Sequence, residues 1–402
     1  MAYHAIFIAS VFLLVAFAIE HMGRRSGVPA VIMMVAVGMT ARVLADATNI
    51  TVNGLGVAVP ILGAVGLVLI VLEGALDIQL RVEHIRTVTG AITTAIGGFL
   101  LCGGLFTVVA APLLGMSHFD AAILAIPFAV ISSAVAIPCS QFLPPAGREF
   151  VLYESSISVI VGVLVFFAFI NANGSVAGVV SKLLGGGAIS LLLSVIFSVG
   201  LVLILMRLDG HIRFIPLLAG LFGLYAAGKV LHLSPLIMVL FFGLALNNPL
   251  LITRFRPFQR WMDPNYDATL KAFKVLVMEL TFAVRGFFFI LLGYWTDLSD
   301  LASLEAWLAA LFILLVVYLG RFVLLRLFRH ELGFALVWIA PRGLITVLLF
   351  LNAKEVLNMP DFLSGTVVLV VLISAALVTF AQRAYAKMKP TPTTQADSLS
   401  ST

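Results

Sequence analysis

The stretch "REFVLYESSISVIVGVLVFF" (148–167) carries a glutamate and three serines into a run that is otherwise almost wholly apolar. A bilayer core of about 30 Å needs about 20 apolar residues per helix, and this run has that length. A charge near the bilayer centre costs about 2.5–3.5 kcal/mol on insertion scales, so such a residue is retained for a role inside the protein. The presence of Glu154 in this run therefore predicts a membrane helix with one face turned toward the protein interior.

Similar apolar runs follow one another along the whole chain. The sequence is 62% hydrophobic and only 11% charged, which excludes an ordinary soluble globular protein. Short polar or Gly/Pro breaks separate about thirteen predicted spans, near residues 3–20, 28–45, 57–76, 90–113, 119–138, 149–171, 179–206, 214–230, 233–252, 275–295, 303–325, 333–351 and 362–382. The predicted fold class is an all-α polytopic membrane protein.

The distribution of basic residues predicts the orientation of these spans. Eighteen of the 24 Lys and Arg residues fall in segments that are cytoplasmic if the N-terminus is outside, and four fall on the other side. Cytoplasmic loops carry such an excess. We predict a multi-pass protein of the cell (inner) membrane, with its N-terminus outside and its C-terminus in the cytoplasm. The same distribution argues against a nucleic-acid partner.

Other parts of the sequence carry little chemistry. The first apolar segment lacks a basic start, so it is expected to be a retained helix and not a signal peptide. Cys102 and Cys139 lie on opposite sides of the predicted topology and indicate neither a disulfide framework nor a zinc site. No cofactor is expected. The polar tail 387–402 is predicted to be disordered.

Few ionisable residues lie inside the predicted spans. The acidic ones are Glu73, Glu154 and, less deeply, Glu279, and the deepest basic ones are Arg285 and Arg342. Such residues face a protein interior or a water-filled cavity and commonly pair. Glu154 and Arg342 are predicted to pair; the pair either only holds two helices together or belongs to a transport path.

Prolines and a glycine predict two interrupted helices. Pro127 and Pro138 bracket Ser132 and Ser133, and Pro341 and Gly343 flank Arg342. Proline removes an amide donor, and irregular backbone survives in lipid only where protein or a cavity surrounds it. If two six-helix repeats flank a seventh linker helix, these are the fifth helices of two inverted halves. Breaks at matching places in inverted repeats indicate an ion or substrate site near the midplane.

The helix that contains Glu154 presents one polar face. At about 100° per residue, Glu154, Ser155, Ser158 and Val159 occupy an arc of about 140°, with Gly162 on the same side. A packing face of small residues would account for the serines and the glycine, but not for the charge. This arc is expected to face the site.

The order and spacing of these motifs resemble the monovalent cation:proton antiporter superfamily, in its prokaryotic sodium/proton exchanger type. The similar segments are "GVPAVIMMVAVGMTAR" (27–42), "LGAVGLVLIVLEGALDIQL" (62–80), "ISSAVAIP" (131–138), "YESSIS" (153–158), "RGFFFILLG" (285–293) and "APRGLITVLLF" (340–350). The resemblance implies a homodimer embedded in membrane lipid. It further implies a dimerisation unit, about 1–76 and 179–295, and a transport unit, about 90–171 and 303–386.

The resemblance also assigns roles to individual residues. Glu154 and Arg342 match a structural ion pair between two helices of the site. The positions at or near the cation site are Glu73, Ser132 or Ser133, Ser155 and Ser158. At Val159 this sequence departs from the pattern, because relatives carry an aspartate there that binds the cation and the proton alternately. Glu73 is then the remaining candidate for that role.

Three classes of function follow. The first is a secondary transporter that exchanges Na⁺, or else K⁺ or Li⁺, for protons; Val159 either impairs its coupling or leaves the role of the aspartate to Glu73. The second is a proton-uncoupled carrier or channel of the same fold for another solute. A membrane enzyme is a distant third, because no nucleophile, histidine and acid come together within the spans, and the prediction is that the protein is not an enzyme. No metal site is expected beyond that for the transported monovalent cation.

Overall fold

The fold of the chain is known from a computed structural model. It describes residues 2–26, 28–48, 55–78, 85–172, 174–183, 192–193, 195–197, 200, 214–231, 235–249, 266–296, 298–328 and 334–388. Every regular element in these ranges is helical, so the predicted all-α class is confirmed. Most of the predicted span 179–206, and residues 389–402 of the predicted tail, lie outside the described residues.

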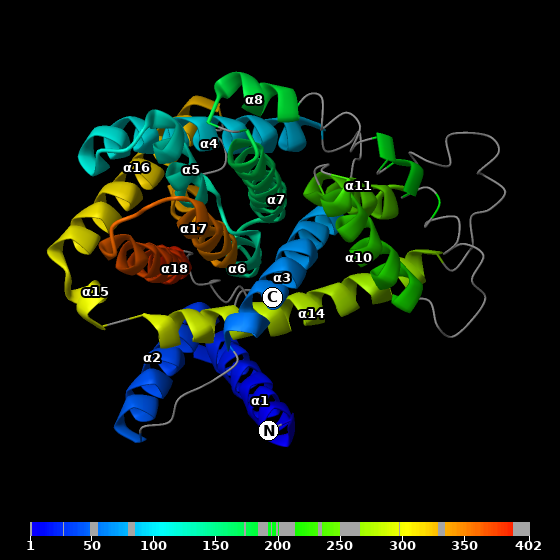
Figure 1. Ribbon diagram of the computed structural model, residues 1–402. Coiled ribbons are helices and arrows are strands. Elements are labelled where there is room, and N and C mark those ends of the chain that lie inside the picture. Colours follow the sequence, from blue (N-terminus) through cyan, green and yellow to red (C-terminus); the bar gives the residue numbers. More distant parts are fainter. Residues whose placement is uncertain are drawn as a thin grey trace, which may run out of the picture.

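The helices follow the predicted spans closely (Figure 1). Those of the first half are α1 (Ala2–Ser26), α2 (Ala30–Thr48), α3 (Leu55–Asp77), α4 (Ile85–Leu114), α5 (His118–Ala129), α6 (Ser133–Cys139), α7 (Pro145–Ile170) and α8 (Val176–Ser181). Those of the second half are α10 (Phe214–Val230), α11 (Pro235–Asn247), α14 (Tyr266–Trp295), α15 (Leu298–Ala302), α16 (Leu304–Phe328), the 3₁₀ helix η4 (Phe334–Trp338), α17 (Leu344–Val356) and α18 (Phe362–Met388).

Among the described residues, seven helical stretches are long and apolar enough to cross a membrane. They begin at Ala30, Arg86, His118, Pro145, Tyr266, Leu304 and Phe362. Apolar side chains also cover outward faces, for example Leu304, Leu308, Leu311 and Leu315 along α16. A helix with an apolar outer face suits lipid as its solvent, so the fold is that of a multi-pass membrane protein.

The helices pack in two groups (Figure 1). One group, here named the crossover bundle, contains α4, α5, α6, α7, α16, η4, α17 and α18. The other, the flanking bundle, contains α1, α2, α3, α10, α11 and α14. The long helix α14 runs along the boundary, and α3 reaches across it to contact α7 and α17.

Glycines allow the closest approach inside the flanking bundle. A Cβ atom at Gly38 of α2 would collide with the carbonyl oxygen of Ile290, and one at Gly293 of α14 would collide with that of Val35. Membrane helices pack closely where small residues let their backbones meet. The backbones of α2 and α14 are therefore in direct contact. This close packing fixes the position of α14 beside the crossover bundle.

Both predicted helix interruptions are present. The segment 130–132 separates α5 from α6, and the segment 339–343 separates η4 from α17. The backbone is extended at Val130 and Ser132, and Gly343 also has an open conformation (φ −160°, ψ −146°). Both segments are buried, as irregular backbone in a membrane protein must be.

Candidate functional site

The two interrupted segments touch each other in the middle of the crossover bundle. The amide of Ser132 donates a hydrogen bond of 2.9 Å to the carbonyl oxygen of Pro341. Gly343 lies against the Ser132 side chain, and a Cβ atom there would collide with the serine hydroxyl. Glycine at position 343 therefore lets the two segments cross in contact.

At the crossing, several backbone amides and carbonyls lack the partners that an unbroken helix would give them. Polar side chains form hydrogen bonds to these groups instead. The Phe128 carbonyl, which would accept from Ser132 in a continuous helix, accepts from Arg342 Nε at 2.8 Å. The amide of Ile131 donates to Ser158 Oγ at 3.0 Å. Arg342 Nη1 also donates to the Ala340 carbonyl at 3.0 Å. Buried backbone groups are costly to leave unpaired. These side chains therefore stabilise the irregular backbone at the crossing.

Pro138 frees one more carbonyl close to the crossing. In α6 the Ala134 carbonyl would accept from the amide of residue 138, but proline has none. Arg285 Nη1, from α14 in the flanking bundle, donates to this oxygen at 3.1 Å. One hydrogen bond thus joins the two bundles at the interrupted helix.

The structure gives Glu154 a different partner from the one predicted. Its carboxylate is held by Arg321 of α16 in a bidentate pair, with Nη1–Oε1 at 2.5 Å and Nη2–Oε2 at 2.7 Å. Arg321 Nε also donates to the Leu336 carbonyl of η4 at 2.9 Å. The predicted pair of Glu154 with Arg342 is wrong, since the Arg342 guanidinium bonds to carbonyl oxygens instead.

Arg321 was missed because its span was predicted to end at residue 325, which placed the arginine among interfacial charges. The helix α16 continues to Phe328, and Arg321 is only 5% exposed. The signal was present in "LFILLVVYLGRFVLLRLF" (311–328), where apolar residues continue on both sides of this arginine. A fork-shaped guanidinium in an apolar helix is well suited to bind one carboxylate with two parallel bonds.

The predicted arc on α7 does face the interior. Glu154, Ser155, Ser158, Val159 and Gly162 are all buried. The Ser155 hydroxyl donates to the Val151 carbonyl of its own helix at 2.7 Å. Val159 is fully buried within an apolar cluster that also contains Val130 and Val163. The position that carries the aspartate in the family pattern therefore lies in a dry, apolar part of the core.

Among the described residues, the crossing offers little room and no carboxylate that lacks a partner. A cavity of about 20 Å³ is lined by Glu154, Ser158, Arg321 and Arg342, among other residues. This volume holds about one water molecule. Ser132 and Ser133 are buried nearby at the crossing. Arg321 neutralises Glu154, and Arg342 adds a second positive charge. The net charge of these three residues is therefore positive.

Glu73 belongs to α3 of the flanking bundle and is not among the residues that line this cavity. It is half-buried in α3 and interacts electrostatically with Arg285 of α14. Asp77, one turn further along α3, interacts electrostatically with Lys274 of α14. The packing of Gly66 against Val284 shows that α3 and α14 run side by side here.

Two buried hydroxyl groups lie near this part of α3. Thr281 of α14 is 1% exposed, and its hydroxyl interacts with the Glu73 carboxylate. Ser156 of α7 is fully buried and packs on Gly74, the residue after Glu73. Open oxygen ligands beside a carboxylate can coordinate a hard cation.

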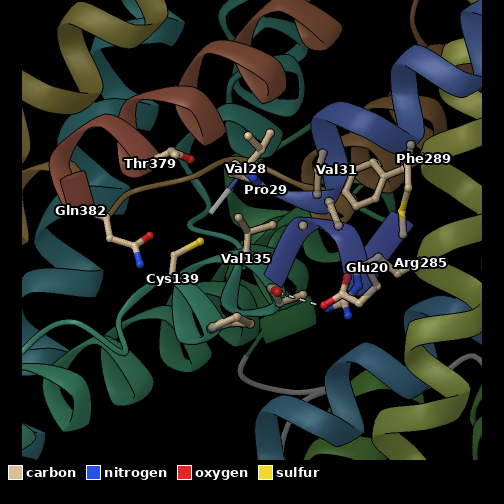
Figure 2. Close-up of a pocket in the computed structure, with 15 residues that line it drawn as sticks. Glu20, Val28, Pro29, Val31, Val135, Cys139, Arg285, Phe289, Thr379 and Gln382 are labelled. Carbon is tan, nitrogen blue, oxygen red and sulfur yellow. Dashed lines mark hydrogen bonds between the residues drawn. The ribbon is translucent and has the colours of Figure 1, made fainter. Parts of the chain in front are cut away.

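A larger cavity of about 240 Å³ opens between the two bundles (Figure 2). Cys139, Thr379 and Gln382 lie on its crossover side. Glu20 and Arg285 lie on its flanking side. Polar groups from both bundles therefore meet in one space beside the interrupted helix α6.

Comparison with known proteins settles the family. A family model described as "Sodium/hydrogen exchanger, transmembrane" matches residues 8–384. The chain belongs to the sodium/hydrogen exchanger family. This exchanger is thus a multi-pass secondary transporter of the cation:proton antiport class, with Na⁺ and H⁺ as the family's substrates, and it is not an enzyme.

Solved structures show the same fold for the exchanger. Two structures of the sodium proton antiporter MjNhaP1 from Methanocaldococcus jannaschii, one of them at pH 8, each match with a TM-score of 0.67 and 19% sequence identity. Each comparison covers 96% of this exchanger, and 98% and 97% of the respective MjNhaP1 chains. No curated protein matches the exchanger in sequence.

Proposed function

We propose that this exchanger moves Na⁺ in exchange for H⁺, and that Glu73 is the carboxylate that binds the two alternately. The observation that carries this is the distribution of carboxylates: Glu154 is fully engaged by Arg321, and Val159 cannot ionise. Glu73 is half-buried beside the buried hydroxyl of Thr281, with which it interacts. Na⁺ is supported by the description of the family and by the printed name of the MjNhaP1 relative.

The chemistry of Glu73 suits this exchange. An ionised carboxylate with nearby hydroxyl oxygens provides hard ligands for Na⁺, and also for K⁺ or Li⁺. The same carboxyl binds one proton when the cation leaves. A single group that cannot hold both at once makes cation and proton compete, and this competition is what antiport requires.

The assembly and orientation belong to the same proposal. Two copies associate as a homodimer in the lipid of the cell membrane, with each N-terminus outside and each C-terminus in the cytoplasm. The flanking bundle serves as the dimerisation unit, about 1–76 and 179–295, and the crossover bundle as the moving transport unit, about 90–171 and 303–386. The split of the packing into two bundles supports this division.

A second function is favoured by one observation. The crossing has no open carboxylate, and Arg342 is positively charged at its centre. A site without an exchanging acid can carry a solute without moving protons. The second candidate is therefore a proton-uncoupled carrier or channel of the same fold, with Val159 as the change that removes coupling.

Transport by purified protein in liposomes separates these functions. Uptake of radiolabelled Na⁺ should follow an imposed pH gradient, and added Na⁺ should move protons, as read by a pH-sensitive dye. Glu73→Gln should abolish both signals. The matched control is Glu279→Gln, which removes an exposed carboxylate on the outward face of α14 and should leave both unchanged.

Three results decide the matter. Exchange that survives Glu73→Gln excludes Glu73 as the binding group. Na⁺ flux without any proton signal favours the uncoupled carrier. Repeating the assay with K⁺ and Li⁺ identifies the cation.

A further inference from the structure

The small cavity at the crossing carries a positive charge that the proposed exchange at Glu73 does not use. Among the described residues that line this cavity, three are charged: Glu154, Arg321 and Arg342. Each of the three is at most 5% exposed. The charges of Glu154 and Arg321 cancel in their bidentate pair, so the charge of Arg342 remains.

Backbone carbonyls bond to the Arg342 guanidinium without neutralising it. Its Nε donates to the Phe128 carbonyl at 2.8 Å, and its Nη1 donates to the Ala340 carbonyl at 3.0 Å. Its third nitrogen, Nη2, donates to none of the described residues. A buried charge is costly unless it is both hydrogen-bonded and paired with an opposite charge. Arg342 has the hydrogen bonds, and a counter-ion in the cavity would supply the opposite charge.

A second donor lines the same cavity. The Oγ atom of Ser158 accepts from the Ile131 amide at 3.0 Å, and Ser158 is 1% exposed. A hydroxyl group both accepts and donates. Because this oxygen already accepts a bond from the backbone, its proton is left for a ligand in the cavity. A buried cation and a buried hydroxyl donor on one small cavity are the groups that bind an anion.

We propose that the crossing binds one small monovalent anion, such as chloride, between Arg342 and Ser158. The cavity of about 20 Å³ has room for one ligand of about the size of a water molecule, and it excludes large anions. A bound anion makes the site neutral, with two positive and two negative charges. A water molecule fits the same space but leaves the charge of Arg342 unbalanced. This inference goes beyond the proposed exchange and does not depend on Glu73.

Thermal unfolding tests the site in the purified protein in detergent. Melting is compared in sodium chloride and in sodium gluconate at equal ionic strength, so that screening is the same in both. A ligand that binds only the folded protein raises its melting temperature once its concentration exceeds the dissociation constant. Chloride should raise the melting temperature by a few degrees, in proportion to the logarithm of its concentration. Bromide should act similarly. Equal melting in chloride and gluconate would overturn the proposal.

Two opposite changes of charge should each remove the chloride response. Arg342→Gln removes the charge that the anion balances. Cys102→Asp places a carboxylate on the wall of the cavity, where it takes over the role of the anion. The matched controls are Arg285→Gln, an arginine that also bonds to a carbonyl but does not line this cavity, and Cys102→Asn, which adds a side chain of the same shape without charge. Both controls should keep the response. If chloride still raises the melting temperature of folded Arg342→Gln or Cys102→Asp protein, the anion binds elsewhere and the proposal is wrong.

Direct measurements decide the question even if neither charge variant folds. Crystals grown in bromide should show one anomalous scattering peak per chain, between Arg342 and Ser158. Radiolabelled chloride should bind at one site per chain, and Arg342→Gln should weaken this binding by about ten- to a hundredfold, the change expected for loss of one charge-assisted hydrogen bond. A cavity without a bromide peak holds water only and refutes the anion site. Exchange at Glu73 can fail in liposomes without altering either result, so the two proposals are tested separately.

Discussion

Replacing Arg321 alone should strongly destabilise the crossover bundle. Arg321→Met removes the guanidinium that donates both hydrogen bonds to the Glu154 carboxylate, at 2.5 and 2.7 Å. The carboxylate then stays buried without this cation. Breaking a buried pair from one side costs about 3–5 kcal/mol, chiefly because the remaining charge is uncompensated. The Leu336 carbonyl also loses its donor, which adds about 1–3 kcal/mol.

The double variant Glu154→Gln/Arg321→Met tests this reasoning. Glu154→Gln removes the buried negative charge that Arg321→Met leaves without a partner. The double variant should therefore recover a large part of the lost free energy of unfolding. A pair replaced from both sides is often close to neutral in stability. The residual loss should reflect the Leu336 carbonyl and the buried amide that Glu154→Gln introduces.

The assay is thermal unfolding of the purified protein in detergent, with the four proteins of the double-mutant cycle measured together. Arg321→Met should lower the apparent melting temperature by several degrees. Arg42→Met is the comparison, because the Arg42–Asp46 pair at 3.0 Å lies toward the surface and is worth only about 0–1 kcal/mol. It also removes a part-buried bond to the Tyr294 carbonyl, but it leaves no buried charge behind, so it should cost much less than Arg321→Met. The reasoning fails if the Arg321→Met variant and the unmodified protein have the same melting temperature. It also fails if adding Glu154→Gln to Arg321→Met restores no stability.

Two further predictions concern the altered position and the topology. Val159→Asp should create or markedly increase pH-dependent Na⁺ or Li⁺ exchange, whereas Val163→Asp, equally buried one turn further from Glu154, should not. A folded, dimeric Val159→Asp protein without any gain would show that the crossing no longer binds cations. In a background without the native cysteines, Asn358→Cys should react with an impermeant thiol reagent from outside, and Gln141→Cys only after permeabilisation, since both positions are exposed. The reverse labelling would overturn the proposed orientation.

Much of the fold could be predicted because its signals are local. Apolar runs long enough to span a bilayer located the helices, and most predicted spans match helix bounds within a few residues. Pro127 and Pro138 bracketed the first interruption and Pro341 lies in the second, although Pro127 and Pro138 themselves stand inside α5 and α6. The burial of the arc from Glu154 to Gly162 followed from helical periodicity alone.

The partners of the charged residues could not be read in the same way. The sequence paired Glu154 with Arg342 because both lie deep in predicted spans and carry opposite charges. In the folded chain, α16 brings Arg321 beside Glu154, while the crossing segments give Arg342 a set of free carbonyl oxygens. Arg285 likewise stood out as a buried charge, but its contact with Ala134 depends on how α14 packs against α6.

The sequence by itself determined that this is a helical membrane protein, where its helices break, and that valine stands at position 159. These properties depend on hydropathy, proline chemistry and residue identity, which act over one or two helical turns. The tertiary structure alone decided which arginine neutralises Glu154, that Glu73 does not line the cavity at the crossing, and that Arg285 joins two bundles. Those choices arise between helices far apart in the chain, where a difference of one turn in packing changes which charges meet.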